Sequence, residues 1–118
     1  MGLAALELQR LRGEESVAMT ELLATIQTMI SSESADLEQI ERTLTDGYAH
    51  ALELEAERSR IERQMAQVTQ EIERGDAAEN ARELASLARR LDGNAGALAK
   101  LRAVLGELRR HASSIRAS

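Results

Sequence analysis

The sequence predicts an all-α fold, built as a long antiparallel helical hairpin of the coiled-coil type with a third, N-terminal helix. Proline is absent and strong helix formers dominate, so summed propensity favours helix almost throughout. The chain is 43% hydrophobic with one Tyr and no Phe or Trp, so its buried surface must be aliphatic. Apolar residues also recur at alternating spacings of three and four, which is the spacing of a coiled-coil seam.

The first element expected along the chain is a helix over residues 3–31. Serine is frequent in residues 31–34, and its hydroxyl competes for backbone hydrogen bonds. We therefore expect the chain to turn there. The alternative is that the seam spacing continues through this stretch and gives one helix of about 60 residues.

Two long helices are expected next, over residues 35–74 and 77–116. The seam of the first contains Leu37, Ile40, Leu44, Gly47, Ala51, Leu54, Arg58, Ile61, Met65, Val68 and Ile72. The seam of the second contains Leu84, Leu87, Leu91, Asn94, Leu98, Leu101, Leu105, Leu108, Ala112 and Ile115. Residues 92–96 have the composition of a loop, but the second seam crosses them unbroken, which favours a continuous helix.

The boundary between the two long helices is the most distinct one in the sequence. Gly75 can end a helix in a left-handed conformation, and Asp76 with Glu79 resembles a capping-box pair. Each flanking helix would be roughly 60 Å long at 1.5 Å per residue. These matched lengths predict an antiparallel hairpin closed by a short loop. A length of 118 residues leaves room for one domain, so we expect residues 1–118 to form a single helical domain.

A register for the hairpin follows from pairing residues whose numbers total 152. It sets large aliphatic side chains opposite one another in the pairs Leu84 and Val68, Leu87 and Met65, and Leu91 and Ile61. It also sets Gly47 opposite Leu105, so that a small residue meets a large one. Arg58 falls opposite Asn94, with Asp92 or Glu55 available to the guanidinium. Such a polar layer costs stability but can fix register.

Charge is distributed unevenly along the chain. Residues 1–80 hold 7 Lys and Arg against 17 Asp and Glu, a balance of −10, whereas residues 81–118 hold 8 against 3, or +5. The two parts should attract each other if they lie side by side. The alternative is that each charged face is simply solvated.

The sequence offers little for catalysis. His50 and His111 are the only histidines, and the predicted register separates them by roughly 13 Å of helical rise. There is no cysteine, no HExxH and no phosphate-binding glycine pattern. Carboxylates stand near arginines, as is typical of solvated helix faces. We therefore expect no enzyme activity, cofactor, metal or small-molecule substrate.

Residues 8–30 resemble the first helix of the all-helical chorismate mutases, on the pairs Leu11-Arg12 and Leu22-Leu23. The resemblance covers about a fifth of the chain. Thr28 stands where that family has an arginine one turn further on, and Ser16 and Met19 stand where it has aspartates. Because most of the family's active-site residues are missing, the mutase activity is not carried over.

The most suggestive feature for binding is apolar surface outside the seam. Tyr48 and Leu52 are one helical turn apart, beside Ala49 and Ala56, and something should cover them. One possible cover is the N-terminal helix, through Leu3, Leu6, Leu11, Met19, Leu22 and Met29. The other is a partner chain or a second copy, with Tyr48 at the centre of the contact. A second small-residue side on the last helix consists of Ala95, Ala97, Ala99 and Val104.

These observations predict a non-enzymatic scaffold, adaptor or oligomerisation module that binds protein partners or further copies of itself. The alternative is a small helical export chaperone, because small size, acidity and amphipathic helices are similar to those of flagellar and type III chaperones. Nucleic-acid binding by the arginines of the last helix is less favoured because stacking aromatics are missing there. No apolar run reaches about 18 residues and the start lacks a basic segment, so we expect neither a membrane span nor a signal peptide, and a cytoplasmic location.

Overall fold

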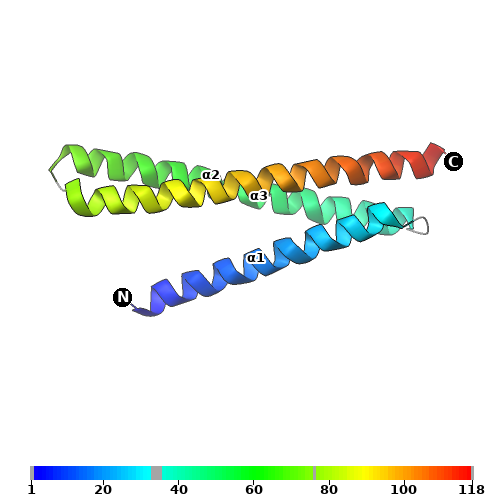
Figure 1. The fold of residues 1–118 in the computed structure, drawn as a ribbon, viewed down its shortest axis with the longest axis horizontal. Helices are drawn as coiled ribbons and strands as arrows, with labels where there is room; N and C mark the ends of the chain where they lie inside the picture. The colour runs from blue at the N-terminus through cyan, green and yellow to red at the C-terminus, as the bar shows by residue number, and fades with distance from the viewer. Residues whose placement is uncertain (1, 33–35, 76, 118) are drawn as a thin grey trace. The chain divides into compact units, whose positions relative to one another are not determined.

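The residues that the structure describes form three helices in the computed structural model (Figure 1). In chain order they are α1 (Gly2–Ser31), α2 (Leu37–Glu73) and α3 (Ala77–Ala117). The structure describes residues 2–32, 36–75 and 77–117, with the side chains of residues 2–16 left out of that description. Within these ranges every regular element is a helix, and α2 packs on α3, which confirms the all-α hairpin.

The helix ends lie within two residues of the expected positions. α1 ends at Ser31 and α2 begins at Leu37, so the serine-rich stretch separates two helices rather than continuing one. Residues 33–35 lie outside the described residues, as does Asp76 of the expected capping box. α3 runs unbroken through Asp92 and Gly96, so the seam spacing, rather than the loop-like composition, decides the structure there.

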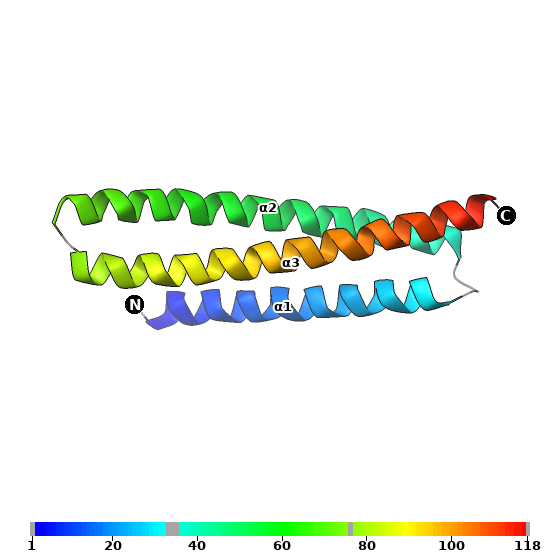
Figure 2. The same cartoon turned by 45° about the horizontal axis from the view of Figure 1, so that its top comes forward.

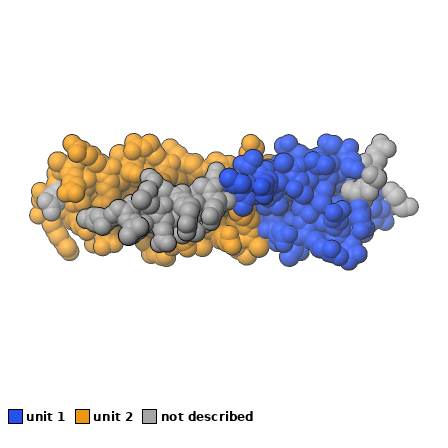
Figure 3. All heavy atoms as spheres, turned by 90° about the horizontal axis from the view of Figure 1, so that it is seen from below, with its two compact units in different colours: residues 1–47, 104–118 blue, residues 48–103 orange. Residues whose placement is uncertain are grey.

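The described helices fall into two compact units (Figure 3). Unit 1 consists of Met1–Gly47 with Val104–Ser118, and unit 2 is Tyr48–Ala103. Unit 2 is a hairpin, in which the second part of α2 and the first part of α3 run antiparallel side by side (Figure 2). Unit 1 contains α1 together with the start of α2 and the end of α3.

The turn of the hairpin depends on Gly75. Its φ angle is +121°, a conformation that side chains with a Cβ rarely adopt. The Arg74 amide donates to the carbonyl of Gln70 at 3.2 Å and the Gly75 amide donates to that of Ile72 at 3.1 Å. These bonds satisfy carbonyl groups that the end of α2 would otherwise leave without a helical donor.

The core of unit 2 is an aliphatic seam between its two helices. Ile61, Val68 and Leu87 are buried, and four half-buried side chains pack against them, namely Met65, Ile72, Leu84 and Leu91. All seven belong to the two predicted seams. The three residue pairs expected opposite one another therefore share one cluster.

The register predicted from the sequence agrees with contacts inside each unit. In unit 1, a Cβ added to Gly47 would lie 2.3 Å from Cδ2 of Leu105, so these two residues, which total 152, face each other closely. Ion pairs on the flanks of the seam fit the same alignment, since e and g positions flank it. They join Glu41 with Arg116 in unit 1, and Glu55 with Arg102 and Glu57 with Arg90 in unit 2. The residue numbers of the first two pairs total 157 and those of the third total 147. Both totals differ by five from 152, the total for residues that face each other in the seam.

Unit 1 has a core to which three helices contribute. Its buried residues are Met19, Ile26 and Met29 of α1, Ile40, Thr43 and Leu44 of α2, and Val104, Leu105, Leu108 and Ala112 of α3. Thr43 and Val104 are buried although both lie outside the predicted seam, on the flank where residue numbers total 147. The Thr43 hydroxyl donates to the Gln39 carbonyl at 3.0 Å, so its burial leaves no unpaired donor. We infer that α1 packs over this flank.

Candidate interaction surface

The apolar residues singled out from the sequence lie on α2 in unit 2, and all of them are exposed. Tyr48 is 42% and Leu52 is 65% exposed, and Ala49 and Ala56 are exposed beside them. Residues four apart on a helix share one face, so the Tyr48 and Leu52 side chains form one continuous apolar area. Large apolar side chains in such a position mark contact sites when they cluster.

α3 adds small residues to the same side of the hairpin. The ion pair of Glu55 with Arg102 shows which flanks of α2 and α3 adjoin. Tyr48 is seven residues before Glu55, and Ala95 is seven residues before Arg102, so all four lie on this side. Leu52 and Ala99 each stand three residues before a member of the pair, one helical turn away on the same side.

We call this surface the Leu52 face and define it as the exposed residues Tyr48, Leu52, Ala95, Gly96 and Ala99. A Cβ added to Gly96 would meet no atom within 4 Å, so the α3 part of the face is a low, open strip. The small-residue side expected on α3 is only partly exposed. Ala97 is half-buried, and Val104 is buried in unit 1.

The expected cover by the N-terminal helix concerns several side chains that the structure does not describe. Leu3, Leu6 and Leu11 lie outside the described side chains, as do Arg12 and Ser16 of the chorismate mutase resemblance. Met19 and Met29 of α1 are buried in unit 1 and Leu22 is half-buried there. The larger described apolar side chains of α1 thus contribute to the core of unit 1, with Val17 as the exposed exception at 58%.

The two polar residues that interrupt the seams, Asn94 and Arg58, differ in their burial and in their partners. Asn94 is 6% exposed, and its side-chain amide donates to the Leu54 carbonyl of the facing helix at 2.9 Å. Its Oδ1 is buried and has no hydrogen-bond partner among the described residues. Arg58 instead is exposed and pairs with Glu62 on its own helix at 2.9 Å, rather than with Asp92 or Glu55 as expected. A long guanidinium leaves the seam at little cost because water solvates it outside.

That Arg58, Asn94 and Asp92 set the register stays a prediction. Asn94 supplies a cross-hairpin hydrogen bond in this layer. Asp92 is exposed on α3.

The described residues hold no group of three His, Cys, Asp or Glu side chains placed to bind a metal ion. The two histidines belong to different units, His50 to unit 2 and His111 to unit 1. Nε2 of His111 is buried without a hydrogen-bond partner within the described part of the chain.

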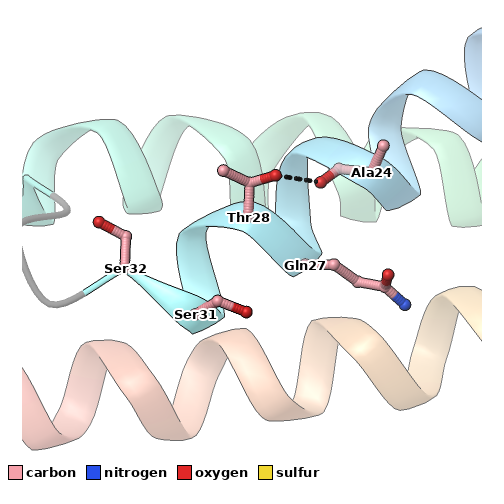
Figure 4. Close-up of a pocket in the computed structure, with 5 residues that line it drawn as sticks. All are labelled: Ala24, Gln27, Thr28, Ser31 and Ser32. Carbon is pink, nitrogen blue, oxygen red and sulfur yellow. Dashed lines mark hydrogen bonds between the residues drawn. The ribbon is translucent and has the colours of Figure 1, made fainter.

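A shallow hollow of about 490 Å³ lies at the C-terminal end of α1, lined by Ala24, Gln27, Thr28, Ser31 and Ser32 (Figure 4). The Thr28 hydroxyl donates to the Ala24 carbonyl at 2.9 Å, so it is already used within the helix. All lining residues come from one helix and its end, and none of them is charged. The hollow therefore lacks the convergent groups that acid–base chemistry or tight ligand binding needs.

The burial of Thr43 and Val104 was not anticipated from the sequence. The sequence feature that could have predicted their burial is the lack of charge at both positions. The equivalent flank positions Glu57 and Arg90, in contrast, form an ion pair. An uncharged pair on a flank is typical of a position that a third helix covers.

Among the described residues, no helix combines the length and apolar character needed to cross a bilayer. Comparison of the chain with protein-family models, with curated proteins and with solved structures finds no match.

Proposed function

We propose that this chain is a non-enzymatic helical interaction module whose unit 2 binds another helix along the Leu52 face. The observation that carries the proposal is the exposure of Leu52 and Tyr48, 65% and 42% respectively, on neighbouring turns of α2. A partner helix laid along this side would bury both side chains. Fully burying a side chain of this size contributes roughly 1.5–3 kcal/mol, which makes these two side chains the energetic centre of the proposed contact.

The shape of the face supports a helix as the bound element. Two antiparallel helices form a shallow groove between them, and a third helix fits into such a groove through residues at helical spacing. The α3 side of the Leu52 face consists of Ala95, Gly96 and Ala99, which allow close approach of a backbone. The ion pair between Glu55 and Arg102 lies between the two helices and could orient a polar edge of the bound helix.

The test compares association of the wild type with that of Leu52→Asp and Tyr48→Asp. Association with itself is measured by light scattering, and association with other proteins by capture on the tagged chain in cells that naturally make it. Val17→Asp is the matched control, because Val17 is also a large exposed apolar residue, at 58%, but lies on α1 in unit 1.

We expect both variants in the Leu52 face to lose association while Val17→Asp keeps it. All three should retain the helical circular dichroism of the wild type because the substituted side chains are exposed. If every association survives Leu52→Asp and Tyr48→Asp, the proposal is wrong.

A further inference from the structure

We infer that the occupant of the Leu52 face is a second copy of this chain, related by a two-fold axis, so that α2 of each copy lies on α3 of the other. The inference rests on the proposed function and names the partner. Its first support is shape. On unit 2 the face presents projecting side chains on α2, Tyr48 and Leu52, and a strip of Ala95, Gly96 and Ala99 on α3.

Leu52 and Ala99 lie at the same level of the hairpin, because their numbers total 151, next to the register value of 152. Tyr48 and Ala95 lie on opposite sides of that level, roughly 13 Å apart along the helices. A two-fold rotation about an axis that is parallel to the helices and lies between the copies carries Leu52 of one copy onto the Ala99 region of the other. In such an interface each contact occurs twice. One favourable packing contact between Leu52 and the Ala99 region therefore contributes two contacts to the dimer.

Charge provides a second support that does not depend on shape. Within unit 2, residues 48–73 of α2 carry three Arg against six Glu, a balance of −3. Residues 77–103 of α3 carry five Lys and Arg against three Asp and Glu, a balance of +2. Pairing α2 with α2 would bring like charges together, whereas pairing α2 with α3 brings opposite charges together.

The same charges favour a second copy over an unrelated helix. A single foreign helix with one net charge would complement either α2 or α3 but would be repelled by the other. A second copy presents both helices, so each acidic segment faces a basic one. On the rim, exposed Glu53 of α2 and exposed Lys100 of α3 are the residues that this arrangement brings toward each other between copies.

The experiment measures the dimer dissociation constant by sedimentation equilibrium for the wild type, Leu52→Arg and Ala99→Glu. We expect each variant to weaken dimerisation at least about tenfold, the equivalent of roughly 1.4 kcal/mol. The control is Ala85→Glu, which is exposed on α3 at the same heptad position as Ala99, two heptads earlier, and lies outside the strip. It should change the constant by less than about threefold.

Mixing the two weakened variants tests the pairing itself. A mixed dimer retains one wild-type contact, between Leu52 of the Ala99→Glu chain and Ala99 of the Leu52→Arg chain. Its other contact sets the new arginine against the new glutamate on the partner copy. Dimerisation should therefore recover on mixing, by at least about fivefold over either variant alone. Tyr48 is the one aromatic residue of the chain, so its fluorescence reports burial of the face directly.

The outcomes separate the two proposals. A wild type that stays monomeric up to about 1 mM overturns the second copy. If such a monomer still captures a partner in a Leu52-dependent way, the proposed function stands with a different occupant. Dimers that Leu52→Arg and Ala99→Glu leave intact, or that do not recover on mixing, would overturn the two-fold pairing of α2 with α3.

Discussion

Asn94 shows how one buried amide can serve specificity at a cost in stability. Its Nδ2 donates to the Leu54 carbonyl at 2.9 Å, but its Oδ1 is buried without a partner among the described residues. An unpaired buried acceptor costs about 1–3 kcal/mol, which is as much as or more than a typical single hydrogen bond contributes. Asparagine in a seam is known to select register where apolar residues would tolerate several alignments.

Replacing Asn94 by leucine should therefore raise the free energy of unfolding, by roughly 1 kcal/mol. The seam positions of α3 one heptad before and after Asn94 already hold buried leucines, Leu87 and Leu101, so the side chain has a suitable environment. Thermal unfolding followed by circular dichroism measures the change. Asn94→Ala is the control, since it removes the amide without filling its space and should not stabilise. A less stable Asn94→Leu variant would mean that Oδ1 gains a partner in solution, such as a buried water.

Gly47 is required for a different reason, namely close approach. A Cβ at this position would lie 2.3 Å from Cδ2 and 3.3 Å from Cγ of Leu105, and Leu105 is only 2% exposed. Alanine would gain about 1 kcal/mol in helix propensity over glycine, but overpacking a core typically costs about 1–3 kcal/mol. We expect Gly47→Ala to destabilise on balance.

A double-mutant cycle separates these two effects. With Leu105→Ala as the background, the clash disappears and only the propensity gain remains, so Gly47→Ala should then stabilise unit 1 by up to about 1 kcal/mol. Urea unfolding of the four proteins gives the coupling free energy. Additive effects of the two substitutions would contradict the close contact.

At the level of whole helices, the end of α2 depends on the backbone of Gly75. Its φ of +121° lies where a Cβ is strained, although nothing occupies the space around it within 4 Å. Gly75→Ala should therefore destabilise the hairpin by about 1–2 kcal/mol through backbone strain rather than through a clash.

Gly93 is the comparison position, because alanine there should raise the free energy of unfolding rather than lower it. It also has no atom within 4 Å of an added Cβ, but it lies within continuous α3 and without a positive φ. Gly93→Ala should stabilise by up to about 1 kcal/mol, from helix propensity alone. Thermal unfolding of both variants tests the pair, and equal shifts in the same direction would contradict a special backbone at Gly75.

At the scale of the whole chain, much of the fold could be predicted because the seam spacing and the helix ends depend on residues that are close together in the sequence. Gly47 with Leu105, and the ion pairs that flank the seam, fit the register predicted from residue numbers alone. Rotamer choice could not be predicted, because Arg58 is free to leave the seam for Glu62. The burial of Thr43 was not predicted because it depends on where α1 packs in unit 1. The spacing of seam residues in α2 and α3 does not indicate where a third helix packs.

The candidate surface could be located from the sequence but its extent could not. Tyr48 and Leu52 stand out because they are apolar at positions outside the seam, and both are exposed. The contribution of α3 to the same side became visible only through the ion pair of Glu55 with Arg102. This contact shows which flank of α3 adjoins α2, a relation that the spacing within either helix does not contain.

The register of unit 2 can be tested directly because the chain has no cysteine. Met65 and Leu87 pack in one cluster and their numbers total 152, so cysteines introduced at both positions should form a disulfide on mild oxidation. The bond would close a loop of about 20 residues and stabilise the hairpin by roughly 3 kcal/mol.

Cysteines at Ile72 and Leu87 are the control, since both positions are in the seam but one heptad out of register. Their Cβ atoms should lie too far apart to bond without unfolding. Intramolecular bonds are distinguished from bonds between copies by mass under denaturing conditions. Efficient intramolecular bonding of the shifted pair, or failure of the aligned pair, would contradict an alignment in which residues totalling 152 face each other.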